Sequence, residues 1–307
     1  MSRRGPTNHH VTKSLNHQIL KTSLDGLYHG FNHPESALDP IQIVRRYPRV
    51  DDREIVAFVA AGLAFGRVAS VMNSVEAVCA VMGPAPAKFV KGFESKRDGA
   101  RLRPIVHRWI RGEHLIALFV VLRRMLESHG SIEAFFDEGR DDAHDDLGPA
   151  LESFSTRALA LVGEPRKSEP RNPGTSEPRN PTWFFSRPST GSACKRLNLF
   201  LRWMIRRDGV DPGGWTRVPT RQLVVPLDTH TIRAGKCLRL TRRASPGWKM
   251  ASEITGALRE LDRDDPVRYD FSLCHLSMMG ACGFGTKQRD TQCPLRGACK
   301  PGRLLAR

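Results

Sequence analysis

The sequence lacks any segment that could span a membrane. In 307 residues, no apolar run approaches the ~18 residues that a bilayer crossing requires. The N-terminus, MSRRGPTNHH, has no apolar stretch behind its basic residues, so no secretory signal peptide is expected either. These two absences predict a cytoplasmic protein with no membrane partner.

Strand patterns are also scarce, because most apolar residues recur at intervals of three and four instead of alternating. The fold class predicted from this spacing is all-α. The predicted helices include Val68 to Met82, Glu113 to His129, a segment ending at Gly163, Thr229 to Leu238, and a segment starting near Ser245.

Two further helices are predicted from their end signals. Asp51 or Asp52 is expected to cap a helix that ends near Gly66. The last helix is expected to have Asp264 or Asp265 as its N-cap, Pro266 at its first position and Gly280 as its terminator.

The hexapeptide SEPRNP occurs twice, at Ser168 to Pro173 and at Ser176 to Pro181. Repeated proline and charge cannot bury enough apolar surface to offset the entropy of ordering, so a disordered linker is predicted. The predicted organisation is a helical lobe at 1–163, a linker at 164–182, a second helical lobe at 183–280 and a basic, cysteine-containing C-terminal loop at 281–307.

The charge is strongly positive, with 48 Lys+Arg against 32 Asp+Glu and an isoelectric point near 10.1. A polyanion is the natural partner of such a chain, because neutralised phosphates release counterions. The alternative is that the arginines are merely a solvated surface.

In the stretch VVPLDTHTIRAGKCL, Asp228 stands between a Pro-interrupted apolar run and a predicted helix. An aspartate there commonly caps the helix, and catalysis is the alternative interpretation. Lys195 opens another helix and lies about 160° from Leu197, which belongs to its apolar stripe. Lys195 is therefore expected to face solvent or a cleft, where it could also be a simple surface lysine or a phosphate contact.

Three local patterns resemble the helix-hairpin-helix DNA glycosylases, the superfamily of endonuclease III and the archaeal-type 8-oxoguanine glycosylases. They are VPLDTHTIR, GSACKRLNLFLRW and CPLRGAC, and the resemblance covers roughly Trp183 to Pro301. It is closest to an uncharacterised bacterial branch. The hairpin glycines are incomplete, the Lys195-to-Asp228 connection is long, and one cluster cysteine is missing.

This resemblance implies two helical lobes with a cleft that binds damaged, double-stranded DNA. It assigns Asp228 to the essential aspartate and Lys195 to the Schiff-base lysine, which would add lyase activity to base excision. The chemistry suits both, since a carboxylate stabilises positive charge on the sugar and a neutral amine can attack C1′. Arg196 and Arg202 are nearby cations expected to lower the pKa of Lys195.

Other residues are assigned to DNA contacts. The expected nucleic-acid-binding residues are Arg196, Arg202, Arg233, Lys287 and Arg296. The aromatic candidates for a base pocket or wedge are Trp183, Phe184, Phe185 and Trp215. Two alternatives are a catalytically silent nucleic-acid-binding protein and an enzyme acting on RNA or on a free nucleoside.

Seven cysteines, an odd number, argue against a disulfide scaffold. The resemblance implies a [4Fe–4S] cluster held by Cys282, Cys293 and Cys299, with Cys274 or Asp290 as the fourth ligand. Reduced thiols and a zinc site are the alternatives.

Overall fold

The computed structural model describes residues 7–36, 38–162, 181–278, 293–296, 298 and 299. These residues are mainly helical, as predicted, and their only sheet is a two-stranded hairpin. None of the described helices combines the length and apolar character that a membrane crossing requires.

The elements before the linker are α1 (Thr7–Phe31), α2 (Ile41–Val44), α3 (Val50–Gly62), α4 (Val68–Met82), α5 (Pro86–Lys91), α6 (Ser95–Leu102), β1 (Val106–His107), β2 (Ile110–Arg111), α7 (Gly112–His129), α8 (Ile132–Asp137) and α9 (Gly148–Ala160). Those after it are η1 (Pro181–Trp183), η2 (Pro188–Thr190), α10 (Lys195–Ile205), η3 (Thr220–Gln222), α11 (Thr229–Cys237), α12 (Trp248–Arg259) and α13 (Asp270–Met278).

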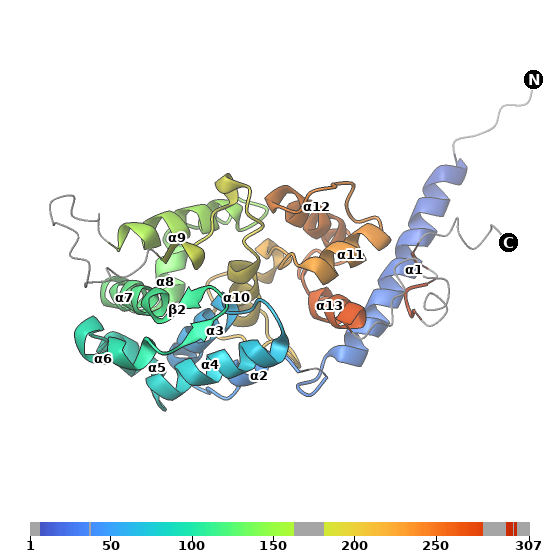
Figure 1. Ribbon diagram of the computed structural model, residues 1–307. Coiled ribbons are helices and arrows are strands. Elements are labelled where there is room, and N and C mark those ends of the chain that lie inside the picture. Colours follow the sequence, from blue (N-terminus) through green and yellow to red (C-terminus); the bar gives the residue numbers. More distant parts are fainter. Residues whose placement is uncertain (1–6, 37, 163–180, 279–292, 297, 300–307) are drawn as a thin grey trace, which may run out of the picture.

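Helices α3 and α10 pack together at the centre of the molecule. The side chain of Phe58 on α3 lies 5.0 Å from that of Phe200 on α10, centroid to centroid, in an edge-to-face pair. Figure 1 shows α5 to α9 on one side of α10 and α11 to α13 on the other, with α2 to α4 beneath it. The central position of α10 places its first residue, Lys195, between these two groups of helices.

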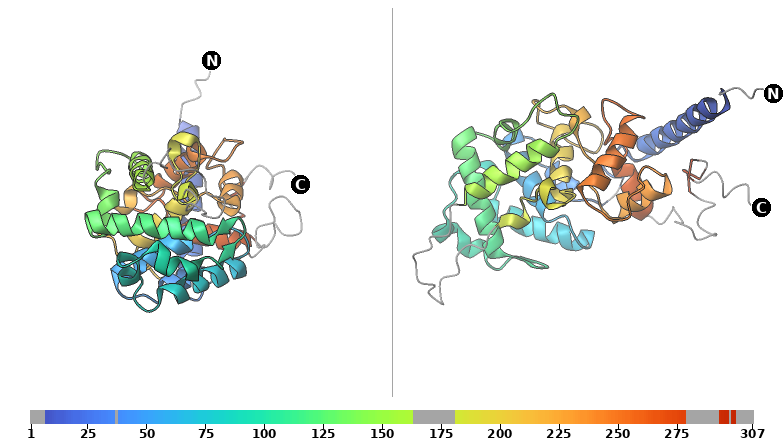
Figure 2. Two further views of the ribbon diagram at one scale, coloured as in Figure 1. Left: turned by 60° about the vertical axis from the view of Figure 1, so that its left-hand side comes forward. Right: turned by 90° about the horizontal axis from the view of Figure 1, so that it is seen from above.

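The first helix, α1, packs against α13, close to the other end of the described chain. The hydroxyl of Tyr269 donates to Asp25 on α1 at 2.6 Å. Figures 1 and 2 show α1 running beside the C-terminal helices and extending beyond them. The N-terminal segment thus completes the packing around α13.

The predicted linker does not divide the molecule into two separate cores. One hydrophobic core includes buried side chains from both sides of it, such as Phe58 and Phe154 before it and Phe185 and Phe200 after it. The packing of α10 on α3 and of α1 on α13 crosses the boundaries predicted at 163 and 183. The predicted linker itself lies outside the described residues, except for Pro181 and Thr182.

Several predicted helix ends agree with the structure, and α4 has the predicted bounds, Val68–Met82. The cap predicted for α3 is wrong, because this helix begins at Val50 after Arg49, which makes no side-chain cap. Asp52 instead accepts a hydrogen bond from the backbone of Ala87 at 2.8 Å, and so joins α3 to α5.

The start predicted for the last helix is also wrong, because α13 begins at Asp270. Asp265 does not cap a helix there; its carboxylate accepts both 2.9 Å and 3.0 Å hydrogen bonds from Nε of Arg206. Arg206, which directly follows α10, therefore binds the carboxylate that the sequence analysis assigned to a helix cap. The predicted terminator, Gly280, lies outside the described residues.

Candidate active site

A pocket of about 480 Å³ lies where five parts of the chain meet. Its walls come from the segment before α2, the α3–α4 loop with the start of α4, helix α10, the start of α11 and α13. The lining includes Phe65 and Gly66 from the loop, Lys195 from α10, Asp228 from α11 and Cys274 from α13. We call it the Lys195–Asp228 pocket.

The two carboxylate oxygens of Asp228 have separate partners. Oδ1 accepts hydrogen bonds from the backbone N–H groups of His230 and Thr231, both at 2.8 Å, and so caps α11. Oδ2 lies 3.8 Å from Nζ of Lys195 and accepts from the thiol of Cys274 at 3.6 Å. Capping and a role in the pocket are therefore compatible, because one oxygen serves each.

Lys195 is held at the mouth of the pocket by the chain around it. Its ammonium donates to the backbone carbonyl of Ala64 at 3.3 Å, and its side chain is 34% exposed. Leu197 and Leu201 of the same helix are buried, which confirms that Lys195 points away from the apolar stripe. Lys195 is thus reachable from solvent while it faces Asp228.

A buried ionic network underlies the pocket. Arg202 donates to Asp270 at 2.7 Å and to Asp211 at 3.1 Å, and these side chains are at most 4% exposed. Arg206 also pairs with Asp211. Burial opposes the charge on Arg202, but Asp211 and Asp270 outweigh it and raise its pKa. The prediction that Arg202 contacts DNA is wrong, since its guanidinium is enclosed by protein carboxylates.

This network connects α10 to the helices that carry the rest of the site. Asp270 accepts from the Thr231 hydroxyl at 3.2 Å, next to the N–H that Asp228 caps. Burial raises the pKa of Asp270 to about 6, against the opposing effect of Arg202 and with a further upward effect of Asp228. The ion pair therefore fixes α10, α11 and α13 around the pocket.

The structure places the remaining predicted DNA contacts differently. Arg196 lies over the ring of Trp183 at 3.9 Å and burial lowers its pKa to about 10, so its guanidinium is engaged in packing. Arg233 is exposed on α11, and Arg296 is half-buried. Lys287 lies outside the described residues.

Three of the four aromatic candidates belong to the core. Phe184 and Phe185 are each 2% exposed, and Trp215 is 5% exposed with its indole N–H donated to Glu54 at 2.9 Å. The prediction that these three form a wedge or pocket wall is wrong. Trp183 is half-buried beneath Arg196.

Sequence reasoning missed the aromatic residues that do lie at the site. Phe65 and Phe271 line the pocket. Trp109, in the turn of the β1–β2 hairpin, is 49% exposed and stacks on Phe65 with ring centroids 4.7 Å apart. The sequence could have indicated Trp109 through the stretch HRWIR, in which a tryptophan lies among basic residues.

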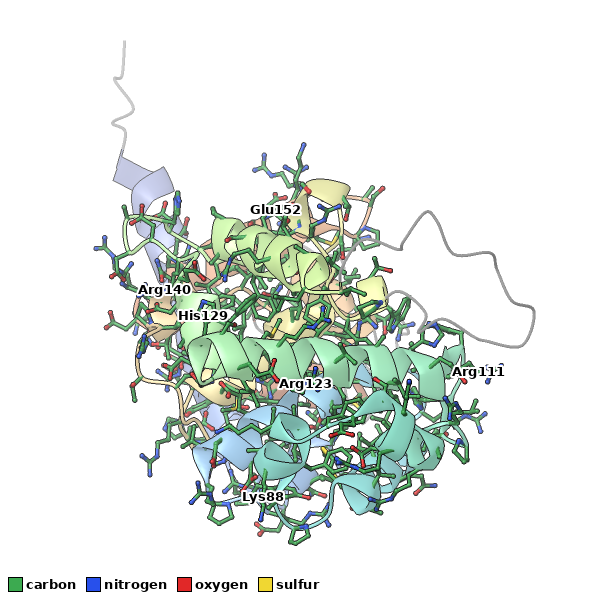
Figure 3. The ribbon with its side chains drawn as sticks, turned by 90° about the vertical axis from the view of Figure 1, so that its left-hand side faces the viewer. Lys88, Arg111, Arg123, His129, Arg140 and Glu152 are labelled. Carbon is green, nitrogen blue, oxygen red and sulfur yellow. The ribbon has the colours of Figure 1, made fainter. Side chains whose placement is uncertain are left out.

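Arginines surround this hairpin and the neighbouring loop. Arg67, Arg108 and Arg111 are all exposed, and we call these three the basic rim. A Cβ on Gly66 would stand 2.6 Å from Nε of Arg108, so the Arg108 side chain lies directly over a residue that lines the pocket. Figure 3 shows Arg111 at the end of α7, with its side chain pointing away from the helices. Within the described chain, none of the three forms an ion pair.

The cysteines do not form a metal site in the part of the chain that is described. There, no group of three or more His, Cys, Asp or Glu side chains could hold a metal ion. Cys282 and Asp290 lie outside the described residues. Burial and the carboxylate of Asp228 raise the pKa of Cys274 well above its usual value, and its thiol donates to Asp228. The assignment of Cys274 or Asp290 as the fourth cluster ligand stays a prediction.

Cys293 is buried and lines a second, small cavity with Cys237, and Cys299 is half-buried. The cluster predicted from Cys282, Cys293 and Cys299 stays a prediction.

The chain belongs to the family described as Protein of unknown function (DUF2400), which it matches over residues 39–279. No curated protein and no solved structure matches it. The matched stretch includes Lys195, Asp228 and all the residues that line the pocket between them.

Proposed function

We propose that this protein is a DNA glycosylase that removes a damaged base at the Lys195–Asp228 pocket. The observation that carries the proposal is the 3.8 Å distance between Nζ of Lys195 and Oδ2 of Asp228. The resemblance to helix-hairpin-helix glycosylases, with two helical lobes around a DNA cleft, assigns roles to these same two residues. The fold brings them together from different helices, as that chemistry requires.

The pocket suits this reaction in its size and its polarity. A volume of about 480 Å³ falls within the range of small-molecule pockets, roughly 300–1,000 Å³. Phe65 and Phe271 provide aromatic walls for a base that has left the helical stack. The amine and the carboxylate then lie beside the sugar to which that base is attached.

The chemistry follows from the two groups. As the N-glycosidic bond breaks, its electrons leave with the base, and Oδ2 of Asp228 stabilises the positive charge that develops on the sugar. For lyase activity, Lys195 gives a proton to Asp228, and its neutral amine bonds to C1′ once the base has left. The C1′–O4′ bond then breaks, Asp228 returns the proton to O4′, and the imine that forms at C1′ allows a C2′ proton to leave together with the 3′-phosphate. Oδ1 stays bonded to the α11 backbone throughout, so the carboxylate does not rotate away.

The surface beside the pocket suits a DNA backbone. The basic rim has three arginines without carboxylate partners among the described residues, and such side chains can neutralise phosphates. Trp109 stands between two of them, where its exposed ring can stack on a base. The basic rim and the exposed ring of Trp109 thus lie beside the pocket that contains Lys195 and Asp228.

The test is base release from a panel of duplexes that each contain one damaged base. The Asp228→Asn variant keeps an oxygen to cap α11, because asparagine is also a good N-cap residue. It should bind DNA like the native protein and lose excision by about 10²-fold or more. The matched control is Asp145→Asn, which changes an exposed aspartate outside the pocket and should leave the rate unchanged.

Excision at the full rate by Asp228→Asn would rule out the catalytic role. Salt-dependent DNA binding without release of any base from the panel would favour the alternative, a catalytically silent nucleic-acid-binding protein.

A further inference from the structure

The stretch between Asp228 and Glu253 carries charge of one sign. It contains six lysines and arginines and no aspartate or glutamate. It forms α11, the loop that follows and the start of α12. Figure 1 shows α11 and α12 on the opposite side of α10 from β2, the strand that carries Arg111 of the basic rim. The positive charge of this stretch is therefore separate from the basic rim.

Three of the six cations are exposed and form no ion pair within the described chain, namely Arg239, Arg242 and Lys249. We call these three the α11–α12 basic surface. Two other cations of the loop already have partners, since Arg243 pairs with Glu253 at 3.0 Å and Lys236 donates to the carbonyl of Ala244 at 3.1 Å. The α11–α12 basic surface thus has charge that the described chain does not neutralise.

Arg239 has a backbone conformation that favours glycine, with a φ of 59°. Its N–H donates to the carbonyl of Lys236 at 3.3 Å, and the N–H of Leu240 donates to the carbonyl of Gly235 at 2.8 Å. This pattern ends many helices at a left-handed residue, which is usually glycine because a Cβ is crowded there. An arginine is kept at this position at a cost to stability, and such strain is concentrated at functional sites.

Arg108 in the basic rim also stands where glycine is favoured. Its φ is 53°, and it is the first residue of the two-residue turn between His107 and Ile110. Hairpin turns of this length usually have glycine at such a position. Among the described residues, three other than glycine have a positive φ, and the two exposed ones are both arginines. Exposed arginines therefore replace glycine on both sides of α10.

The loop after α11 is attached to the segment that leads to Lys195. The N–H of Trp248 donates to the carbonyl of Gly191 at 3.3 Å. A Cβ on Gly247 would stand only 2.8 Å from that carbonyl oxygen, so glycine permits this close approach. The loop that carries the α11–α12 basic surface is thus anchored four residues before Lys195 in the sequence.

We propose that the α11–α12 basic surface binds phosphates of the DNA whose damaged nucleotide enters the Lys195–Asp228 pocket. This inference rests on the proposed function, since it takes DNA as the ligand. An arginine binds a phosphate through two parallel N–H donors, so the exposed guanidinium of Arg239 suits this contact. The DNA is then held on both sides of α10, by the basic rim and by the α11–α12 basic surface.

The variant Arg239→Gly separates binding from stability. Glycine accepts a φ of 59° without strain, so the variant should melt no lower than the native protein. Its affinity for a DNA duplex should fall about 5-fold at about 0.15 M salt, and the slope of log affinity against log salt should fall by roughly 0.9, because one phosphate contact is lost. Fluorescence titrations of the full-length protein at several salt concentrations measure both. Native affinity and slope in Arg239→Gly would overturn the inference.

Two control variants test whether the position of the charge matters. Arg239→Lys keeps the charge and should keep the slope. Arg263→Gln removes an exposed arginine beyond the other end of α12 and should leave the slope unchanged. A fall in slope with Arg263→Gln equal to that with Arg239→Gly would mean that net charge alone decides the affinity, against the proposal.

The same titrations with an RNA duplex of equal length identify the nucleic acid. Tighter binding of RNA than of DNA, with the same loss in Arg239→Gly, would assign the surface to RNA and overturn the proposal.

This proposal and the glycosylase proposal fail separately. A reduced salt slope in Arg239→Gly with no base release from DNA would keep the α11–α12 basic surface and remove the glycosylase. Base release from DNA with an unchanged slope in Arg239→Gly would do the reverse.

Discussion

Arg202 donates to Asp270 at 2.7 Å beneath the pocket, and both side chains are almost completely enclosed. Because Asp270 also accepts from Thr231 on α11, this ion pair joins three helices whose ends form the site. This pairing explains why a strongly basic protein has carboxylates in its interior, because Asp211 and Asp270 neutralise the buried arginines Arg202 and Arg206.

Removing Arg202 should therefore destabilise the protein strongly. Arg202→Met leaves Asp270 buried without its cation and leaves Asp211 with Arg206 alone, which should cost about 3–5 kcal/mol in the free energy of unfolding. Urea denaturation measures this change. The control is Arg46→Met, whose partner Glu76 is 47% exposed and which should cost less than about 1 kcal/mol. Similar costs for both variants would contradict the structural role.

Lys195 can be tested as a nucleophile by borohydride reduction in the presence of abasic DNA. Reduction should trap a covalent protein–DNA adduct in the native protein, because the imine formed at C1′ becomes a stable amine. Lys195→Ala should form none. The control is Lys88→Ala, an exposed lysine of α5 outside the pocket, seen at the lower edge of Figure 3. An adduct of undiminished yield with Lys195→Ala would mean that another amine reacts.

The basic rim should determine the salt dependence of DNA binding. Alanine at Arg67 or at Arg111 should each reduce the slope of log affinity against log salt by roughly 0.9, the contribution of one neutralised phosphate. The measurement is a fluorescence titration with a short duplex at several salt concentrations. An unchanged slope in both variants would place the DNA elsewhere on the surface.

Trp109 should act differently from its arginine neighbours. Trp109→Ala should weaken DNA binding by about 1–3 kcal/mol through lost stacking, with the salt slope unchanged because no charge is removed. The control is Val106→Ala, which trims an exposed apolar side chain, 52% exposed, on the same hairpin. Equal losses in the two variants would argue against stacking on the indole.

The stability of the fold should depend on pH through Glu54. Burial raises the pKa of Glu54 to about 7, although hydrogen bonds from the backbone N–H groups of Ile132 and Glu133 oppose this shift. The folded state then holds a proton that the unfolded state releases near pH 4.5. This contribution is complete below pH 4.5 and is lost as the pH rises through 7, a change of the order of 3 kcal/mol.

The matched variant for this effect is Glu54→Gln, which cannot titrate. Urea denaturation at pH 5 and at pH 8 should show a larger fall in unfolding free energy for the native protein than for the variant. Other titrating groups cancel in this comparison. Parallel pH dependences would mean that Glu54 does not hold the proton.

The sequence alone determined the helical class and the local surroundings of the two central residues. Apolar spacing predicted α4 with its correct bounds, and α11 to within one residue at its end. It also placed Lys195 off the apolar stripe and Asp228 at an N-cap. These features depend on residues within a few positions of one another, so local periodicity and capping chemistry are enough to predict them.

Only the tertiary structure decided which charged and aromatic side chains are buried. In the sequence, Arg202 and Arg111 look alike, as do Phe185 and Trp109, yet the first of each pair lies in the core and the second on the surface. The meeting of Lys195 with Asp228 likewise joins segments that are distant in the chain. Such contacts depend on how whole helices pack, and no local pattern records that packing.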